Sequence, residues 1–213
     1  MPGARGGMPA CTQPQEDPMT SETSVVTPDR FASGIDSFGE WMDAIEGREA
    51  EFQRHYDEYE PDADDLAAVA SLVESHGVKA LVLGEHWCPD VWRGLPVIAK
   101  IAERADMELR MFFRDQNNDI MSEFLKDGEF ESIPTIVFYD ADHNELGHWI
   151  ERPALANEEM APLREIMEGV ERGSPEFDDA RARYMDATWE RSVNWRHAQL
   201  SELRALLEGA LGG

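Results

Sequence analysis

The spacing of apolar side chains divides the chain into helical and extended segments. Between residues 38 and 76 apolar positions recur every three or four residues, which predicts two helices, one ending before Pro61 and one at Gly77. The pattern then changes, because residues 80–83 form a short continuous apolar run, as a strand buried on both faces requires. A sheet therefore begins near residue 79.

After this strand the two patterns alternate. A helix is predicted to begin with Cys88 as its N-cap and Pro89 at its first position. The order of elements, β-α-β-α-β-β-α, predicts an α/β fold with a mixed sheet covered by helices on both faces. The remaining predicted elements are strands at residues 109–113, 135–139 and 145–150, the last two joined as a hairpin, and helices near 120–125 and 160–167.

The two ends of the chain differ from this central part. Residues 1–30 are rich in Gly, Pro, Ser and Thr without an apolar period, which predicts a disordered tail. From residue 176 a long helix carries an apolar stripe, which we expect to pack on the domain; the alternative is a surface for a homodimer or another partner. We therefore divide the chain into a tail (1–30), a domain with two N-terminal helices (31–175) and a C-terminal helical extension (176–213).

The net charge excludes several classes of partner. The 44 acidic and 19 basic side chains give a formal charge of −25, which repels nucleic acids and anionic membrane surfaces. No segment reaches the roughly 18 apolar residues of a membrane helix, and no signal peptide is recognisable. The two cysteines, Cys11 and Cys88, are far apart, so we expect no disulfide framework and a cytoplasmic protein.

Cys88 is the candidate nucleophile. A cysteine reacts as the thiolate, and the free amides and dipole of a helix N-terminus stabilise that anion. The amides of Asp90 and Val91 are available to the sulfur, whereas the carboxylate of Asp90 opposes a second negative charge. His86 and Cys88 alone supply too few ligands for zinc or an iron-sulfur cluster, so we predict no metal and no cofactor.

Two motifs carry a resemblance to a known family. The segment Trp87-Cys88-Pro89-Asp90-Val91 follows one apolar strand, and Ser132-Ile133-Pro134-Thr135 opens another, with Pro96 eight positions after the cysteine. Over residues 78–150 this arrangement resembles the thioredoxin family. The resemblance implies a thioredoxin-like sheet in which Pro134 is a cis-proline facing Cys88. The implied substrate-binding residues are Trp87, Pro89, Asp90, Val91, Trp92, Ile133 and Pro134.

Two of the departures from the family pattern bear directly on the thiol chemistry. Thioredoxins carry a resolving cysteine where this chain has Val91, and a buried acid where it has Val82. A mixed disulfide at Cys88 would need release by an external thiol or by the distant Cys11. We therefore expect monothiol thiol-disulfide exchange with protein or low-molecular-weight thiols in redox homeostasis. The alternative is a non-catalytic thioredoxin-fold binding or scaffold module, and the sequence leaves open whether the protein is an enzyme.

Overall fold

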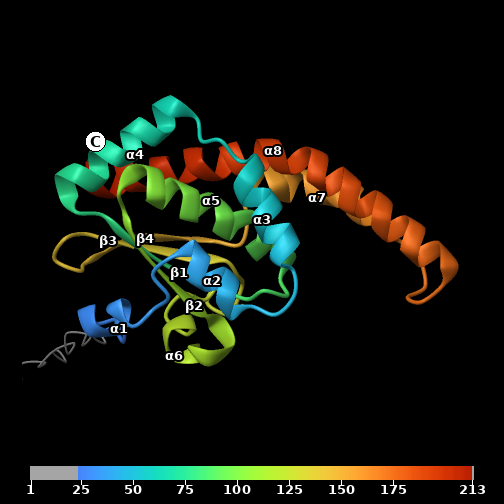
Figure 1. Cartoon of the computed structure of the whole chain (residues 1–213), viewed down its shortest axis with the longest axis horizontal. Coiled ribbons are helices and arrows are strands. Elements are labelled where there is room, and N and C mark those ends of the chain that lie inside the picture. Colours follow the sequence, from blue (N-terminus) through green and yellow to red (C-terminus); the bar gives the residue numbers. More distant parts are fainter. Residues whose placement is uncertain (1–23, 213) are drawn as a thin grey trace, which may run out of the picture.

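The fold is built on a four-stranded mixed sheet (Figure 1). The computed structural model describes residues 24–212. The strands are β1 (Lys79–Gly84), β2 (Glu108–Phe113), β3 (Thr135–Tyr139) and β4 (Glu145–Ile150), in the spatial order β2-β1-β3-β4. β1 pairs with β2 in parallel, and β3 pairs in antiparallel fashion with both β1 and β4. The predicted order of elements along the chain from β1 onward and the mixed sheet are confirmed.

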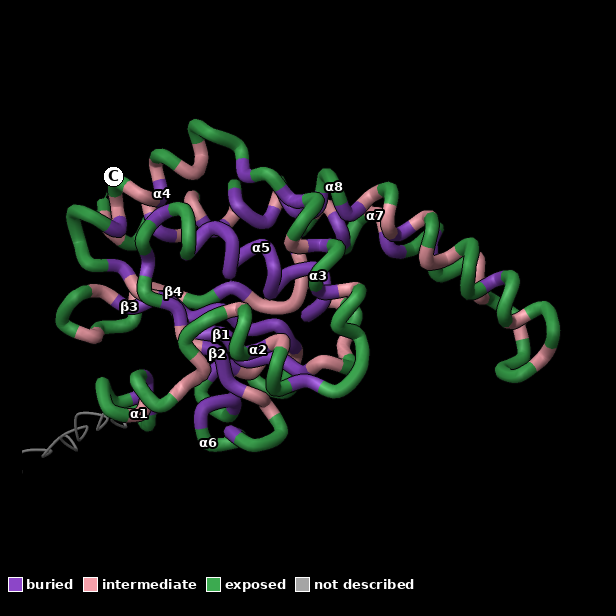
Figure 2. Tube along the Cα trace, viewed as in Figure 1, coloured by how far each residue is buried: buried purple, intermediate pink, exposed green. Residues whose placement is uncertain are grey.

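Helices cover both faces of this sheet. The longer helices α3, α4, α5 and α8 lie over one face, and the short helices α1 and α6 lie on the other side (Figure 1). The strands β1 and β3 and the helix α5 consist mostly of buried residues (Figure 2). The helices are α1 (Pro28–Ala32), α2 (Phe38–Ala44), α3 (Glu49–Glu58), α4 (Ala63–His76), α5 (Pro89–Ala105), α6 (Asn118–Met121), α7 (Ala154–Glu165) and α8 (Pro175–Leu211), with a 3₁₀ turn η1 (Arg114–Gln116).

The prediction of two N-terminal helices is wrong, since four precede β1. The predicted first helix is interrupted between α2 and α3, where Ile45 is extended and both Gly47 (φ 87°) and Arg48 (φ 73°) are left-handed. Glycine adopts this conformation freely, whereas arginine does so at a cost. Because Trp41 before the break and Phe52 after it are buried in the same core, apolar spacing alone does not reveal the interruption.

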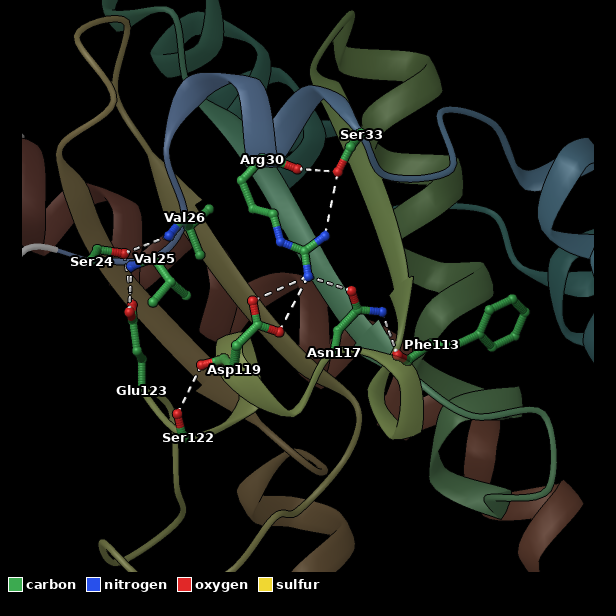
Figure 3. A network of polar contacts seen from close by, with 10 residues as sticks. All are labelled: Ser24, Val25, Val26, Arg30, Ser33, Phe113, Asn117, Asp119, Ser122 and Glu123. Carbon is green, nitrogen blue, oxygen red and sulfur yellow. Dashed lines mark hydrogen bonds and ion pairs between the residues drawn. The ribbon is translucent and has the colours of Figure 1, made fainter.

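The described part of the predicted tail is ordered. Residues 24–30 lie against the sheet domain, and Val26 is buried. Val25 N donates to Glu123 Oε1 at 2.5 Å, and the Arg30 guanidinium donates to Asn117 Oδ1 at 2.6 Å (Figure 3). The predicted tail boundary at residue 30 is therefore too late. The predicted disorder of residues 1–23, and with it Cys11, lies outside the described residues.

The C-terminal helix belongs to two different parts of the molecule. Its last third packs on α4, α5 and β4, and three of its leucines, Leu200, Leu203 and Leu207, are buried in the main core. α7, predicted as a helix covering the domain, packs on α8 through a second apolar cluster that includes Leu163 and Trp195. We call α7, its connection and the first half of α8 (residues 154–195) the helical arm, which extends away from the sheet (Figure 1).

Membrane-spanning helices and metal-binding clusters were both considered in the sequence predictions. No helix within residues 24–212 is long and apolar enough to cross a membrane. In the same range, no three side chains of the His, Cys, Asp or Glu type converge in a way that could hold a metal ion.

Candidate active site around Cys88

The chain turns sharply between β1 and α5. Cys88 is the N-cap of α5, with extended backbone angles (φ −86°, ψ 122°), and Pro89 occupies the first turn, as predicted. The backbone N–H of Cys88 donates to the Glu85 carbonyl at 3.1 Å. The buried Glu85 carboxylate accepts the amide of Asp115 at 2.8 Å, which ties this turn to the segment after β2. The turn thus leaves the Cys88 side chain at the helix N-terminus.

A cis-proline faces this cysteine. The Ile133-Pro134 peptide bond is cis, and the Cys88 thiol donates to the Ile133 carbonyl oxygen at 3.6 Å. Pro134 and Ile133 are both buried, Ile133 being 5% exposed, and the Ile133 carbonyl accepts from the Cys88 thiol. A Cβ placed on Gly94 of α5 would lie 3.1 Å from Pro134 Cγ, which explains why glycine suits this position. The structure therefore brings the two motifs together.

The other predicted substrate-binding residues divide into exposed and buried groups. Trp87 is 49% exposed and Pro89 is exposed, so both are accessible to a partner. Val91 is fully buried and Trp92 is 4% exposed, with the indole N–H donating to the His86 carbonyl at 2.6 Å. Both side chains point from α5 into the core, so the contact of Val91 and Trp92 with substrate stays a prediction that their burial does not favour.

The environment of Cys88 opposes ionisation. Burial is the main cause that raises the pKa of the Cys88 thiol, and the Asp90 carboxylate raises it further. The amides of Val91 and Asp90 and the guanidinium of Arg93 act in the opposite direction but do not overcome burial. The half-buried sulfur is consequently held as a thiol that donates a hydrogen bond, and only a minor fraction is thiolate at neutral pH.

Asp90 belongs to an ion-pair network. Its carboxylate accepts from Arg93 at 3.2 Å and from Arg152 at 2.7 Å. Burial raises the pKa of Asp90, and the two guanidinium groups oppose that shift. Arg152 also pairs with Glu151, which in turn pairs with Lys126. Asp90 is therefore engaged with side chains of this chain rather than presented to a ligand.

Sequence reasoning missed this network. Asp90 and Arg93 are spaced i,i+3 on a helix, so the charge pattern of the sequence alone could have predicted this pair. Arg152 lies 62 positions after Asp90, and nothing in the sequence indicates that the two side chains meet.

The fold and this site define the class of thioredoxin-like proteins. A family model described as Thioredoxin matches residues 36–166, which is more than half of the chain. The chain belongs to the thioredoxin family. No curated protein matches the chain at a significant level.

One of two similar solved structures shares the fold. The crystal structure of a protein of unknown function from Pseudomonas aeruginosa is 21% identical, with 84% of this chain and 95% of that chain covered and a TM-score of 0.58. The crystal structure of an HIV epitope scaffold is 22% identical over 81% of this chain and 98% of that chain, with a TM-score of 0.40. The first likeness supports the fold alone.

Proposed function

We propose that this thioredoxin-family protein performs monothiol thiol-disulfide exchange through Cys88. The observation that carries the proposal is the position of the half-buried sulfur, at the N-terminus of α5 and 3.6 Å from the carbonyl of Ile133, which precedes cis-Pro134. The exposed Trp87 offers apolar surface beside it. An extended peptide lying along the Ile133 backbone would bring its own sulfur to Cys88.

The proposed reaction uses one thiol of the protein and consists of two exchange steps. The Cys88 thiolate attacks one sulfur of a disulfide, so that a bond between Cys88 and that sulfur forms, the original S–S bond breaks, and the second sulfur leaves as a thiolate that takes up a proton. A low-molecular-weight thiol then attacks the mixed disulfide, forms a new disulfide with the bound sulfur and returns Cys88 as thiolate. No net oxidant is required. The proposal includes a cytoplasmic location, because a reducing compartment supplies that thiol.

The raised pKa of Cys88 sets the expected rate. With the thiolate a minor species at neutral pH, exchange should be slow at pH 7 and rise about tenfold for each pH unit until the thiol is ionised. The fully buried Val91 stands at the position of a resolving cysteine. Because valine has no thiol, the mixed disulfide should persist until an external thiol arrives.

The second candidate function is a non-catalytic binding module. It is favoured by the same burial that raises the pKa of Cys88, and by the apolar, buried side chains of Val82 and Val91. In this case the exposed Trp87 and the backbone of Ile133 would bind a partner without sulfur chemistry, and Cys88→Ala would leave binding unchanged.

The deciding experiment follows Cys88 alone, in a Cys11→Ser background. We would measure the rate of alkylation against pH, and mass spectrometry would detect adducts with glutathione disulfide. A persistent adduct that Cys88→Ser abolishes would support exchange. Val91→Cys is the matched variant, because a restored resolving thiol should release the adduct without external thiol. Failure of Cys88 to form any adduct up to pH 9 would overturn the proposal in favour of the binding module.

A further inference from the structure

Behind the N-terminus of α5, two arginines hold one carboxylate. Arg152 Nη2 donates to Asp90 Oδ2 at 2.7 Å, and Arg93 Nη1 donates to Asp90 Oδ1 at 3.2 Å. These three side chains are between 10 and 14% exposed, so solvent and salt screen the ion pairs weakly. The carboxylate held in this way stands two residues after Cys88.

The segment that carries Arg152 is anchored to the strand of the cis-proline. Glu151 N donates to the Pro134 carbonyl at 2.7 Å, and Glu151 has a left-handed backbone (φ 74°) that turns the chain as it leaves β4. The Glu151 carboxylate pairs with both Lys126 and Arg152. Contacts within the Arg152 segment therefore hold its guanidinium in the position from which it donates to Asp90.

The helical arm meets the same network from α8. The Arg93 guanidinium lies 5.8 Å from the ring of Trp195, whose indole N–H donates to Glu159 of α7 at 2.7 Å. Arg196 of α8 lines the same small cavity as Asp90. The charged groups that face Asp90 from the elements packed around it are thus Arg93, Glu151, Arg152 and Arg196, with Lys126 reached through Glu151.

We propose that Arg152 is a positioning residue for Cys88: by pairing with Asp90, its guanidinium holds that carboxylate in the small cavity that both residues line, and so limits how strongly the negative charge opposes formation of the Cys88 thiolate. The inference deepens the proposed exchange function and rests on it. Asp90 disfavours ionisation of Cys88, and Arg93 on the same helix favours it directly. Arg152 instead contacts the carboxylate, so its influence on the sulfur passes through Asp90.

An effect of Arg152 that passes through Asp90 predicts that substitutions at these two positions are coupled. If Arg152 acts by holding the Asp90 carboxylate in place, its removal should matter while residue 90 is a carboxylate and should matter little once that carboxylate is an amide. A merely structural role for Arg152 would not depend on the charge at position 90. A double-mutant cycle separates the two, since residues in one network are not additive.

The test measures the pH profile of Cys88 alkylation in the full chain with Cys11→Ser. Arg152→Gln should slow alkylation at pH 7.5 by about three- to tenfold, because an Asp90 carboxylate that Arg152 no longer holds can approach the sulfur and disfavour the thiolate. Asp90→Asn should accelerate it, and adding Arg152→Gln to Asp90→Asn should change the rate by less than about twofold. Arg164→Gln, which removes an exposed arginine of α7, is the matched control and should react like the parent.

Two results would overturn the inference. One is a rate for Arg152→Gln equal to that of Arg164→Gln at every pH; the other is the same slowing in the carboxylate and amide backgrounds. Should Arg152→Gln not fold, as judged by circular dichroism, Arg152→Lys keeps the test: partial loss of the charge pair should give partial slowing that again disappears with Asp90→Asn.

Two separate readouts distinguish failure of this inference from failure of the exchange function. Alkylation reports the acid-base state of the sulfur, whereas the proposed function is read from the adduct with glutathione disulfide. Altered alkylation without any adduct would support the role of Arg152 and defeat the exchange function. An adduct whose formation ignores Arg152 would do the reverse.

Discussion

The two ends of α8 bury their apolar side chains in different clusters. In the last third, Leu203 is 1% exposed and packs with the sheet domain, and Gly147 of β4 lets Leu206 come close, since a Cβ there would lie 3.2 Å from Leu206 Cδ2. In the first half, α8 contacts α7 through the smaller cluster around Leu163 and Trp195. One continuous helix therefore belongs to the folding core at one end and to the helical arm at the other.

Burial of an apolar helix face therefore depends on which other elements of the chain pack against it. A surface helix presents one apolar stripe, and tertiary packing decides whether that stripe closes a large core or a small one. Regions with few buried contacts open locally at a lower free energy than the global unfolding transition. We therefore expect the arm and the sheet domain to differ in stability, and the following changes test that comparison.

Leu203→Ala should give the largest effect. Removing a fully buried leucine from the main core leaves a cavity next to α5 and the sheet, and such substitutions cost about 2–5 kcal/mol of unfolding free energy. Chemical denaturation monitored by circular dichroism measures the loss. A cost below about 1 kcal/mol would show that the end of α8 is not part of the cooperative core.

A buried histidine at the contact between α3 and α8 should make the free energy of unfolding depend on pH. His55 is buried, its Nδ1 faces Arg196 at 3.1 Å, and burial together with nearby arginines lowers the pKa of His55 from 6.5 to about 3. The unfolded chain binds a proton here below about pH 6.5 while the folded chain does not, so stability is lost as pH falls through this window. Between pH 6.5 and 4.5 the loss from His55 should be about 2–3 kcal/mol.

A matched pair of variants isolates that contribution from the carboxylates. His55→Gln should lose less stability than the parent on acidification, whereas His148→Gln, which removes an exposed histidine of β4, should follow the parent. Equal pH dependence in all three proteins would show that His55 is not held neutral in the fold.

The sequence predicts much of the sheet domain and its site. Apolar runs and the hairpin pattern locate all four strands, and the preference of proline for the first helical position locates the start of α5 at Pro89. The burial of Trp92 does not follow, because α5 is covered on several sides and its apolar spacing does not say which face remains open. The pairing of Arg152 with Asp90 depends on a left-handed Glu151 that no residue type signals.

Leu163→Ala should act locally. The leucine is buried between α7 and α8 in the arm cluster, away from the sheet. We expect hydrogen exchange to accelerate in α7 and in the first half of α8, while unfolding monitored at the sheet changes by less than about 1 kcal/mol. Equal acceleration in β1 and β3 would mean that the arm and the sheet domain unfold as one unit.

Val193→Ser should have the smallest effect and addresses the homodimer alternative. The valine is 45% exposed on α8, whereas Leu200, Leu203 and Leu207 of the same predicted stripe are covered by the protein's own core. An exposed substitution of this kind changes stability by no more than about 0.5 kcal/mol. Because the main apolar face is already occupied, we expect sedimentation to give the same mass for Val193→Ser and the parent; a dimeric parent that the substitution dissociates would assign the exposed side of α8 to an interface between copies.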